Sequence, residues 1–178
     1  MLLQEYQVNW PKDFTEIKKI LIDANQGIKI AIEHVGSTSV PELPAKPIID
    51  MDVIFYEVSD FEKIKSRLET LGYYHNGDQG IEGREVFKRR ANNDHQVIDT
   101  IRHHLYVCHH QSRELKKHLL FRDYLRNNPN ARSRYAKIKY ELAEKAYQDK
   151  NIYALLKEQG VNDFINKCIK KQESKHGK

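Results

Sequence analysis

Short apolar runs alternate with amphipathic stretches over the first 110 residues of the chain. Residues 13–24 carry apolar side chains at intervals of three and four, which predicts a helix. Residues 28–35 and 48–55 are short runs rich in Ile and Val, which predict two strands. The same reasoning predicts a helix over 59–71 with a capping box at Ser59-Asp-Phe-Glu62, strands over 84–90 and 96–107, and a turn over 91–94 between them.

Only helical periodicity remains in residues 111–178. No linker separates this part from the rest, so we expect one domain over 1–178, with a mixed core over 1–110 and a helical part over 111–178. The pattern as a whole predicts the α/β (α+β) class, with a mixed sheet flanked by helices. Three helical stripes are expected, the last broken near Gly160: Leu115, Leu119, Tyr124 and Leu125; Tyr135, Ile138, Leu142 and Ala146; Leu156, Phe164, Ile165, Cys168 and Ile169.

The strand over 48–55 carries the most informative polar residues. Asp50 and Asp52 are two positions apart, so their side chains point to one face, roughly 6–7 Å apart. Their neighbours are apolar, and buried acids cost free energy unless they are paired, protonated or bound to a cation. Two carboxylates at this separation can share Mg²⁺ or Mn²⁺, which prefer oxygen ligands. The alternative is a pair of structural carboxylates that form salt bridges with nearby Lys and Arg.

A glycine turn and scattered cations suggest a phosphate ligand. Gly36 and Ser37 end the first strand, and backbone amides with a serine hydroxyl can hold phosphate there. Lys46 precedes the aspartate strand, and Arg84 follows a glycine-rich stretch, so both could meet a triphosphate. A phosphate loop with paired carboxylates is the minimum for metal-assisted nucleotidyl transfer. Taken alone, each cation fits a solvated surface charge better than a ligand contact.

The strand expected over 96–107 presents a second polar face. Arg102, His104 and Tyr106 share one parity, opposite the core positions. Because imidazole titrates near neutral pH, His104 is a candidate metal ligand or general base. The alternative is a surface histidine on a polar strand. His103 has the core parity and is expected to be a buried, hydrogen-bonded histidine.

The amino-acid composition limits the kinds of ligand that the protein is expected to bind. The net charge is +5, from 30 basic and 25 acidic side chains, which suits a nucleoside triphosphate or a related phosphorylated small molecule. This excess is too small and too scattered for a nucleic-acid-binding protein. The two cysteines lack metal-ligand spacing. No signal peptide and no membrane-spanning run is visible, so a cytoplasmic location without membrane association is expected.

Several motifs resemble those of the GrpB family (glutamate-rich protein B). They are Glu33-His-Val-Gly-Ser-Thr-Ser-Val-Pro41, Ala45-Lys-Pro-Ile-Ile-Asp50, His103-His-Leu-Tyr-Val107, Leu120-Phe-Arg-Asp-Tyr-Leu-Arg126 and Tyr135-Ala-Lys-Ile-Lys139. The resemblance covers nearly the whole chain and implies the fold of the nucleotidyltransferase superfamily. It leaves function more open, because a fold does not dictate chemistry.

Two departures from the related patterns affect the expected function. The family usually has a histidine where this chain has Tyr106, and active nucleotidyltransferases bring a third carboxylate from a neighbouring strand. Here Glu33 and Glu85 are the candidates, and Asp99 has the wrong parity. We therefore expect a metal-dependent transfer of a nucleoside monophosphate to an unknown acceptor. The alternative is a non-catalytic module that binds a nucleotide or a coenzyme.

Overall fold

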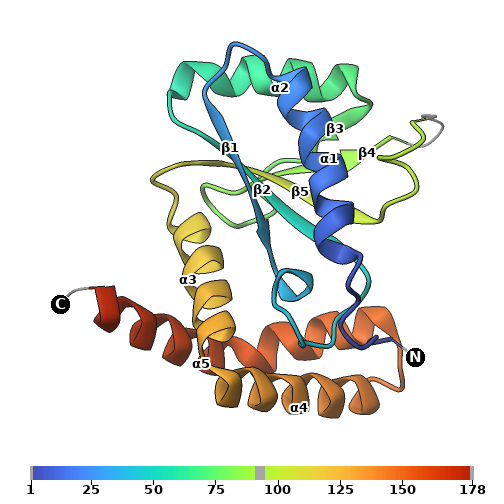
Figure 1. The fold of residues 1–178 in the computed structure, drawn as a ribbon, viewed down its shortest axis with the longest axis vertical. Helices are drawn as coiled ribbons and strands as arrows, with labels where there is room; N and C mark the ends of the chain where they lie inside the picture. The colour runs from blue at the N-terminus through green and yellow to red at the C-terminus, as the bar shows by residue number, and fades with distance from the viewer. Residues whose placement is uncertain (1, 91–94, 177–178) are drawn as a thin grey trace.

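The structure contains a five-stranded sheet, which includes the two strands predicted over 28–35 and 48–55. The computed structural model describes residues 2–90 and 95–176, without the side chains of residues 158, 175 and 176. Strand β1 (Ile30–Val35) lies antiparallel to β2 (Ile49–Phe55), and β2 lies parallel to β5 (His103–His109). Strands β4 (Glu85–Arg89) and β3 (Tyr73–His75) complete the sheet in the order β1-β2-β5-β4-β3 (Figure 1).

One face of the sheet is covered by the helices of the first half of the chain. These are α1 (Trp10–Ala24) and α2 (Phe61–Thr70). Met51 and Val53 of β2 point to this face and have no exposed surface. Because residues alternate along a strand, Asp50 and Asp52 point to the opposite face. The core on the covered face includes Trp10, Ile17, Leu21, Ile32, Ile64, Leu68, Phe87, Leu105 and Val107.

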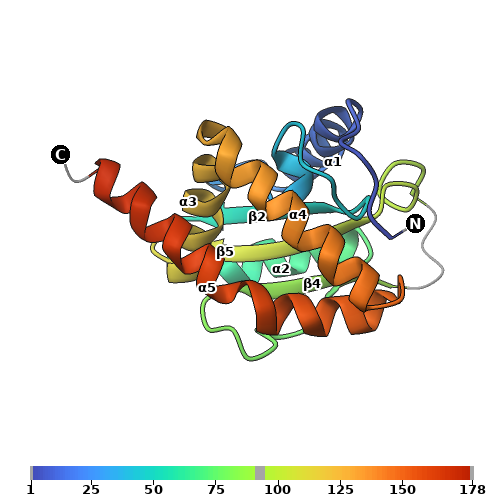
Figure 2. The same cartoon turned by 90° about the horizontal axis from the view of Figure 1, so that it is seen from below.

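Three helices follow the last strand and pack together. They are α3 (Arg113–Asn127), α4 (Pro129–Lys145) and α5 (Lys150–His176). Seen from below, α4 and α5 run in front of the strands (Figure 2). Their apolar side chains form a second core with Val40 and Leu43 of the loop after β1. This arrangement confirms the predicted class, a mixed sheet flanked by helices with a C-terminal helical part.

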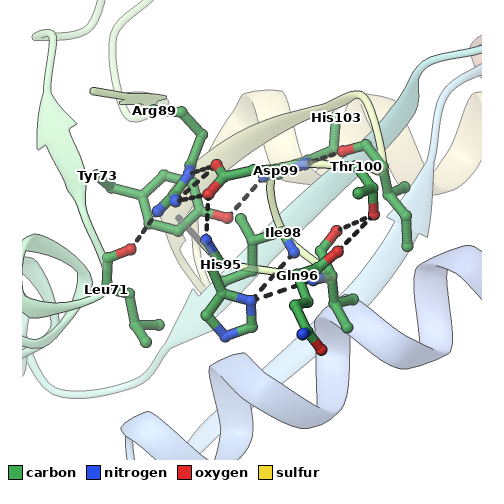
Figure 3. Close-up of polar contacts among 11 residues, drawn as sticks. Leu71, Tyr73, Arg89, His95, Gln96, Ile98, Asp99, Thr100 and His103 are labelled. Carbon is green, nitrogen blue, oxygen red and sulfur yellow. Dashed lines mark hydrogen bonds and ion pairs between the residues drawn. The ribbon is translucent and has the colours of Figure 1, made fainter. Parts of the chain in front are cut away.

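The strand predicted over 96–107 is wrong in its first half, because β5 begins only at His103. Residues 95–101 instead form turns that Asp99 ties to the neighbouring strand. Its carboxylate accepts hydrogen bonds from Nε and Nη2 of Arg89, each at 2.7 Å, and from the backbone of His95 (Figure 3). This bidentate ion pair anchors the segment to β4 through side chains, in place of the backbone hydrogen bonds of a strand.

His103 is hydrogen-bonded beneath this segment, as predicted. Its Nδ1 donates to the carbonyl of Ile101 at 2.7 Å, so Nε2 accepts from the hydroxyl of Tyr73 at 2.6 Å (Figure 3). Burial lowers the pKa of His103, which keeps the imidazole neutral in this role.

Other element boundaries also differ from the prediction. Helix α2 follows a 3₁₀ turn, η2 (Val58–Asp60), and has no side-chain cap, so the predicted capping box is wrong. Helix α5 runs unbroken through Gly160. The predicted turn over 91–94 lies outside the described residues. In the described ranges, no helix is both long enough and apolar enough to cross a membrane.

We predict that Gly160→Ala stabilises the protein. A Cβ at this position would meet only Leu142 Cδ2, at 3.8 Å, which is ordinary contact. Replacing a glycine inside a continuous helix should raise the free energy of unfolding by about 0.5–1 kcal/mol. Urea unfolding measures the change. Gly160→Pro should destabilise by about 3 kcal/mol, and an alanine variant no more stable than the wild type would argue against an unbroken helix.

Candidate functional site

The parallel pairing of β2 with β5 brings two predicted residues into contact. Asp50 lies opposite His104 in the register, and Asp52 lies opposite Tyr106. Nδ1 of His104 is 2.8 Å from Oδ1 of Asp50. The carboxylate accepts this hydrogen bond, so Nδ1 carries the proton and Nε2 is left for another partner.

Gly36 passes directly over Asp50. Its φ of 69° and ψ of −170° lie in a region that only glycine adopts readily. A Cβ at this position would lie 2.2 Å from Oδ2 of Asp50, which no side chain can do. The turn continues into a short 3₁₀ helix, η1 (Ser37–Ser39), in which the Ser39 hydroxyl donates to the Gly36 carbonyl at 2.6 Å. The Gly36-Ser37 loop and the carboxylate of Asp50, both singled out from the sequence, are therefore in direct contact.

Two adjoining cavities lie between this face of the sheet and the C-terminal helices. The larger has a volume of about 600 Å³ and the smaller about 320 Å³, and we call them the large cavity and the small cavity. Among the described residues, they share six lining residues: Ser37, Asp50, Tyr106, Lys157, Asn162 and Ile165. Gly36 lines the small cavity. Of the residues singled out from the sequence, the large cavity brings together Ser37, Lys46, Asp50, Arg102 and His104.

Of the two cations expected to meet a triphosphate, Lys46 lines the cleft and Arg84 does not. Lys46 lines the large cavity, where Nζ donates to the carbonyl of Lys150 at 3.2 Å and lies 4.5 Å from the ring centroid of Tyr153. Burial lowers its pKa. Arg84 lines neither cavity, and its guanidinium carbon lies 4.7 Å from the ring centroid of Tyr106. Arg84 can therefore act on the cleft only through Tyr106 or through its charge.

His118 of α3 is a contact that the sequence analysis missed. Its Nδ1 is 2.8 Å from Oδ2 of Asp52, which has no exposed surface. Burial raises the pKa of Asp52, although the hydrogen bond with His118 opposes this. Burial alone would lower the pKa of His118, but the hydrogen bond to Asp52 and the charges of Asp52 and Glu114 raise it. No local pattern signals this pair, because 66 residues separate its members.

Two lysines of the helical part were also missed. Lys139 of α4 is 2% exposed, and its ammonium group donates to the carbonyl of Pro44. Burial lowers its pKa well below the usual value. Lys157 of α5 lines both cavities. In the sequence both lysines look like ordinary charges on helices, and only the packing of α4 and α5 over the sheet directs them to the cleft.

The acids considered as a third carboxylate are all engaged elsewhere. Oε2 of Glu33 lies 2.5 Å from Nη1 of Arg122, and Oε2 of Glu85 lies 2.6 Å from Nε2 of His75. Asp99 holds the segment before β5, as described above. Within the described part of the chain, no three His, Cys, Asp or Glu side chains gather as ligands for a metal ion.

Two carboxylates are nevertheless compatible with a hard cation. Oδ1 of Asp52 is buried and has no hydrogen-bond partner among the described residues, and such an oxygen is costly unless a donor or cation satisfies it. Mg²⁺ in nucleotide enzymes is commonly held by one or two carboxylates, with phosphate oxygens and water completing its shell. The fit to Mg²⁺ or Mn²⁺ is partial, because Asp50 lines both cavities whereas Asp52 has no exposed surface and lines neither. A phosphate ligand and water would have to complete the shell.

We predict that Gly36→Ala is more destabilising than Gly27→Ala. Both glycines have positive φ, 69° and 80°, but nothing lies within 4 Å of a Cβ at Gly27. Gly27→Ala should cost about 1–2 kcal/mol from the backbone alone. Gly36→Ala should cost about 3 kcal/mol or more, because its Cβ also displaces Asp50. Urea unfolding of both variants measures the difference, and equal losses would contradict a tight contact at Asp50.

We predict that the stabilising effect of His118 depends on pH. Its raised pKa means that the fold favours the protonated ring. Its contribution is complete below the unfolded pKa of about 6.5 and is lost as pH rises through the higher folded pKa. The wild type should therefore exceed His118→Gln in free energy of unfolding by more at about pH 6 than at about pH 9. His110→Gln, which removes an exposed histidine, is the control, and a pH-independent gap for His118→Gln would refute the ion pair.

The chain is similar in sequence to bacterial proteins of one family. The sequence profile of the GrpB protein family matches residues 1–170. The glutamate-rich protein GrpB of Alkalihalophilus pseudofirmus is 34% identical over 168 residues, which cover 93% of this chain and 94% of that protein. UPF0157 protein YqkA of Bacillus subtilis is 34% identical over 160 residues, which are 90% of this chain but only 43% of YqkA.

Solved structures extend the likeness to the fold. The conserved protein GrpB from Enterococcus faecalis superposes with a TM-score of 0.79 at 30% identity, over 99% of both chains. The poly(U) polymerase Cid1 in complex with the UTP analogue UMPNPP gives a TM-score of 0.54 at 11% identity, over 79% of this chain and 42% of Cid1. At that identity the likeness shows a nucleotidyltransferase-like fold alone. By sequence and structure, this chain belongs to the GrpB family.

Proposed function

We propose that this chain binds a nucleoside triphosphate in the large cavity and transfers its nucleoside monophosphate to an acceptor, with Mg²⁺ or Mn²⁺ at Asp50 and Asp52. The observation that carries the proposal is the contact between Gly36 and Asp50. The Gly36-Ser37 turn lies against a carboxylate of the central strand, on a sheet with the nucleotidyltransferase-like fold. This arrangement supports phosphate and cation binding at one place.

The charge of the large cavity supports a triphosphate ligand. Among its described lining residues, Asp50 is the one acid, against five lysines and arginines, of which Lys139 has a pKa lowered well below the usual value by burial. Clefts lined by one sign of charge concentrate ligands of the opposite sign. The Cid1 structures, which share this fold, were obtained with a UTP analogue and with MgATP. The five cations are Lys46, Arg102, Lys139, Lys150 and Lys157.

The residues of the cleft have distinct roles in this proposal. The Ser37 hydroxyl, at the junction of the two cavities, positions the phosphates, and Gly36 lets the loop approach Asp50 at that junction. Lys46 and Arg102 offset the phosphate charge. Arg84 adds positive charge from behind Tyr106. His104 uses Nε2 to accept the acceptor's proton while Asp50 holds Nδ1. Asp50 and Asp52 would hold a cation, which would supply positive charge against the phosphates and make a nearby hydroxyl more acidic.

A second function is favoured by a different observation. Asp52 is fully buried against His118, and β5 presents His104 and Tyr106 where a catalytic carboxylate would be expected. A cleft with these features supports nucleotide or coenzyme binding without turnover. In that case the chain would act as a regulatory or accessory module.

We predict that pyrophosphate release from nucleoside triphosphates depends on Asp50. Labelled ATP, GTP, CTP and UTP with Mg²⁺ would be screened against pooled sugars, amino alcohols, tRNA and the protein itself. Asp50→Asn should lower the rate by at least about 100-fold, because a ligand of the cation and the carboxylate partner of His104 are both lost. Asp23→Asn makes the same chemical change at an exposed position of α1 and should leave the rate unchanged.

The screen separates the two functions. Nucleotide binding by calorimetry without pyrophosphate release in any pool would favour the accessory module. Release that persists in Asp50→Asn would place the chemistry outside this cleft. If no nucleotide binds and none turns over, both proposals fail.

A further inference from the structure

The two cavities that meet at Asp50 differ in charge. Among the described residues that line the large cavity, one acid faces five lysines and arginines. The small cavity has two acids, Asp50 and Glu114, against Lys117, Arg122 and Lys157. His118 also lines it, and its ring is paired with the carboxylate of Asp52. Only Lys157 and Asp50 are common to both sets. A strongly anionic ligand is therefore expected to bind in the large cavity.

The cations specific to the small cavity are already neutralised by the protein. Arg122 contacts Glu33 at 2.5 Å and Asp123 at 2.8 Å, and it also donates to the carbonyl of His34. Nζ of Lys117 lies 3.0 Å from Oε2 of Glu114. Paired cations offer little net attraction to a second anion, because a phosphate would have to displace an existing carboxylate partner.

The small cavity also has an apolar wall. Val35, Val40 and Leu125 are buried, and Phe121 and Tyr135 contact edge to face with ring centroids 5.2 Å apart. Polar side chains also line this cavity, among them Glu114, Asn162 and Asn166. A volume of about 320 Å³ is at the lower end of the range for small-molecule sites. Its ligand must be small, with one apolar side and one hydrogen-bonding side.

We propose that the small cavity is the acceptor site, and that it takes a small alcohol or amine without negative charge. This inference rests on the function proposed above, because it assigns the large cavity to the nucleoside triphosphate. Ser37, Asp50, Tyr106 and Lys157 line both cavities, so a ligand in each would meet the other at these residues. Such a junction is what a transfer between two bound molecules requires.

The transfer balances with these two ligands alone. The acceptor's oxygen or nitrogen forms a bond to the α-phosphorus. The bond from that phosphorus to the oxygen bridging to the β-phosphate breaks, and pyrophosphate leaves with the electron pair. The acceptor's proton passes to Nε2 of His104. His104 lines the large cavity, so the reacting oxygen or nitrogen must reach from the small cavity to the junction at Asp50. No oxidant, reductant or third substrate is needed.

Nuclear magnetic resonance of ¹⁵N-labelled protein tests the assignment of the cavities. The probes are 2-phenylethanol and phenylethanolamine, the anionic analogue phenyl phosphate, a short oligouridylate, and ATP with Mg²⁺. We expect the first two to shift the backbone amides of Phe121 and Asn166, which report on the small cavity. ATP should shift those of Lys46 and Asn151, which report on the large cavity.

Two matched variants on α5 separate the cavities. Asn166 lines only the small cavity, Asn151 lines only the large one, and both are exposed, so each tolerates a phenylalanine on the helix surface. Asn166→Phe should weaken phenylethanolamine binding at least about tenfold and leave ATP affinity within about twofold. Asn151→Phe should do the reverse.

The outcomes distinguish this inference from the function on which it rests. If ATP binds in the large cavity but phenyl phosphate or oligouridylate shifts Phe121 and Asn166 more than the uncharged and cationic probes do, the acceptor class is wrong. If ATP binds and none of the other probes reaches these amides, or if Asn166→Phe weakens ATP as much as Asn151→Phe, the acceptor site is wrong. If ATP itself does not bind, the proposed function fails first.

Discussion

The parallel pairing of β2 with β5 is the constraint on which the site depends. Parallel neighbours cannot be joined by a tight turn, so the chain between them builds α2, β3 and β4 before it returns. The return sets one register, which places Asp50 beside His104 and Asp52 beside Tyr106. A slip of one residue would turn His104 into the core and bring His103 to the cleft. The identity of the site is therefore fixed by backbone hydrogen bonds.

The strands with dense apolar patterns were predictable from the sequence, and the segments held by side chains were not. β2 was predicted because apolar residues alternate with its two acids, and the face of Asp50 followed from the period of two. The segment before β5 has similar composition, but Asp99 is bonded to Arg89 instead of a strand partner. His118 and Lys139 could not be assigned, because their contacts join residues 66 and 95 positions apart.

The sheet and the helical part contribute different things to the cleft. The sheet supplies the carboxylates, His104 and the Gly36 loop. The helices supply Lys139, Lys157 and His118, and they divide the space above Asp50 into regions of different charge. A substitution on α3–α5 can therefore change the charge of either cavity while the register of β2 and β5 stays the same.

The absence of a side chain at residue 36 has a mechanical consequence. The loop backbone and the carboxylate of Asp50 occupy adjoining space with no room for a methyl group between them. Interiors packed this closely transmit displacement instead of absorbing it. Rotation of the Asp50 carboxylate must therefore be accompanied by movement of the loop, and a ligand that fixes the loop also fixes the rotamer of Asp50. The two parts behave as one jointed element, and through His104 that element reaches the neighbouring strand.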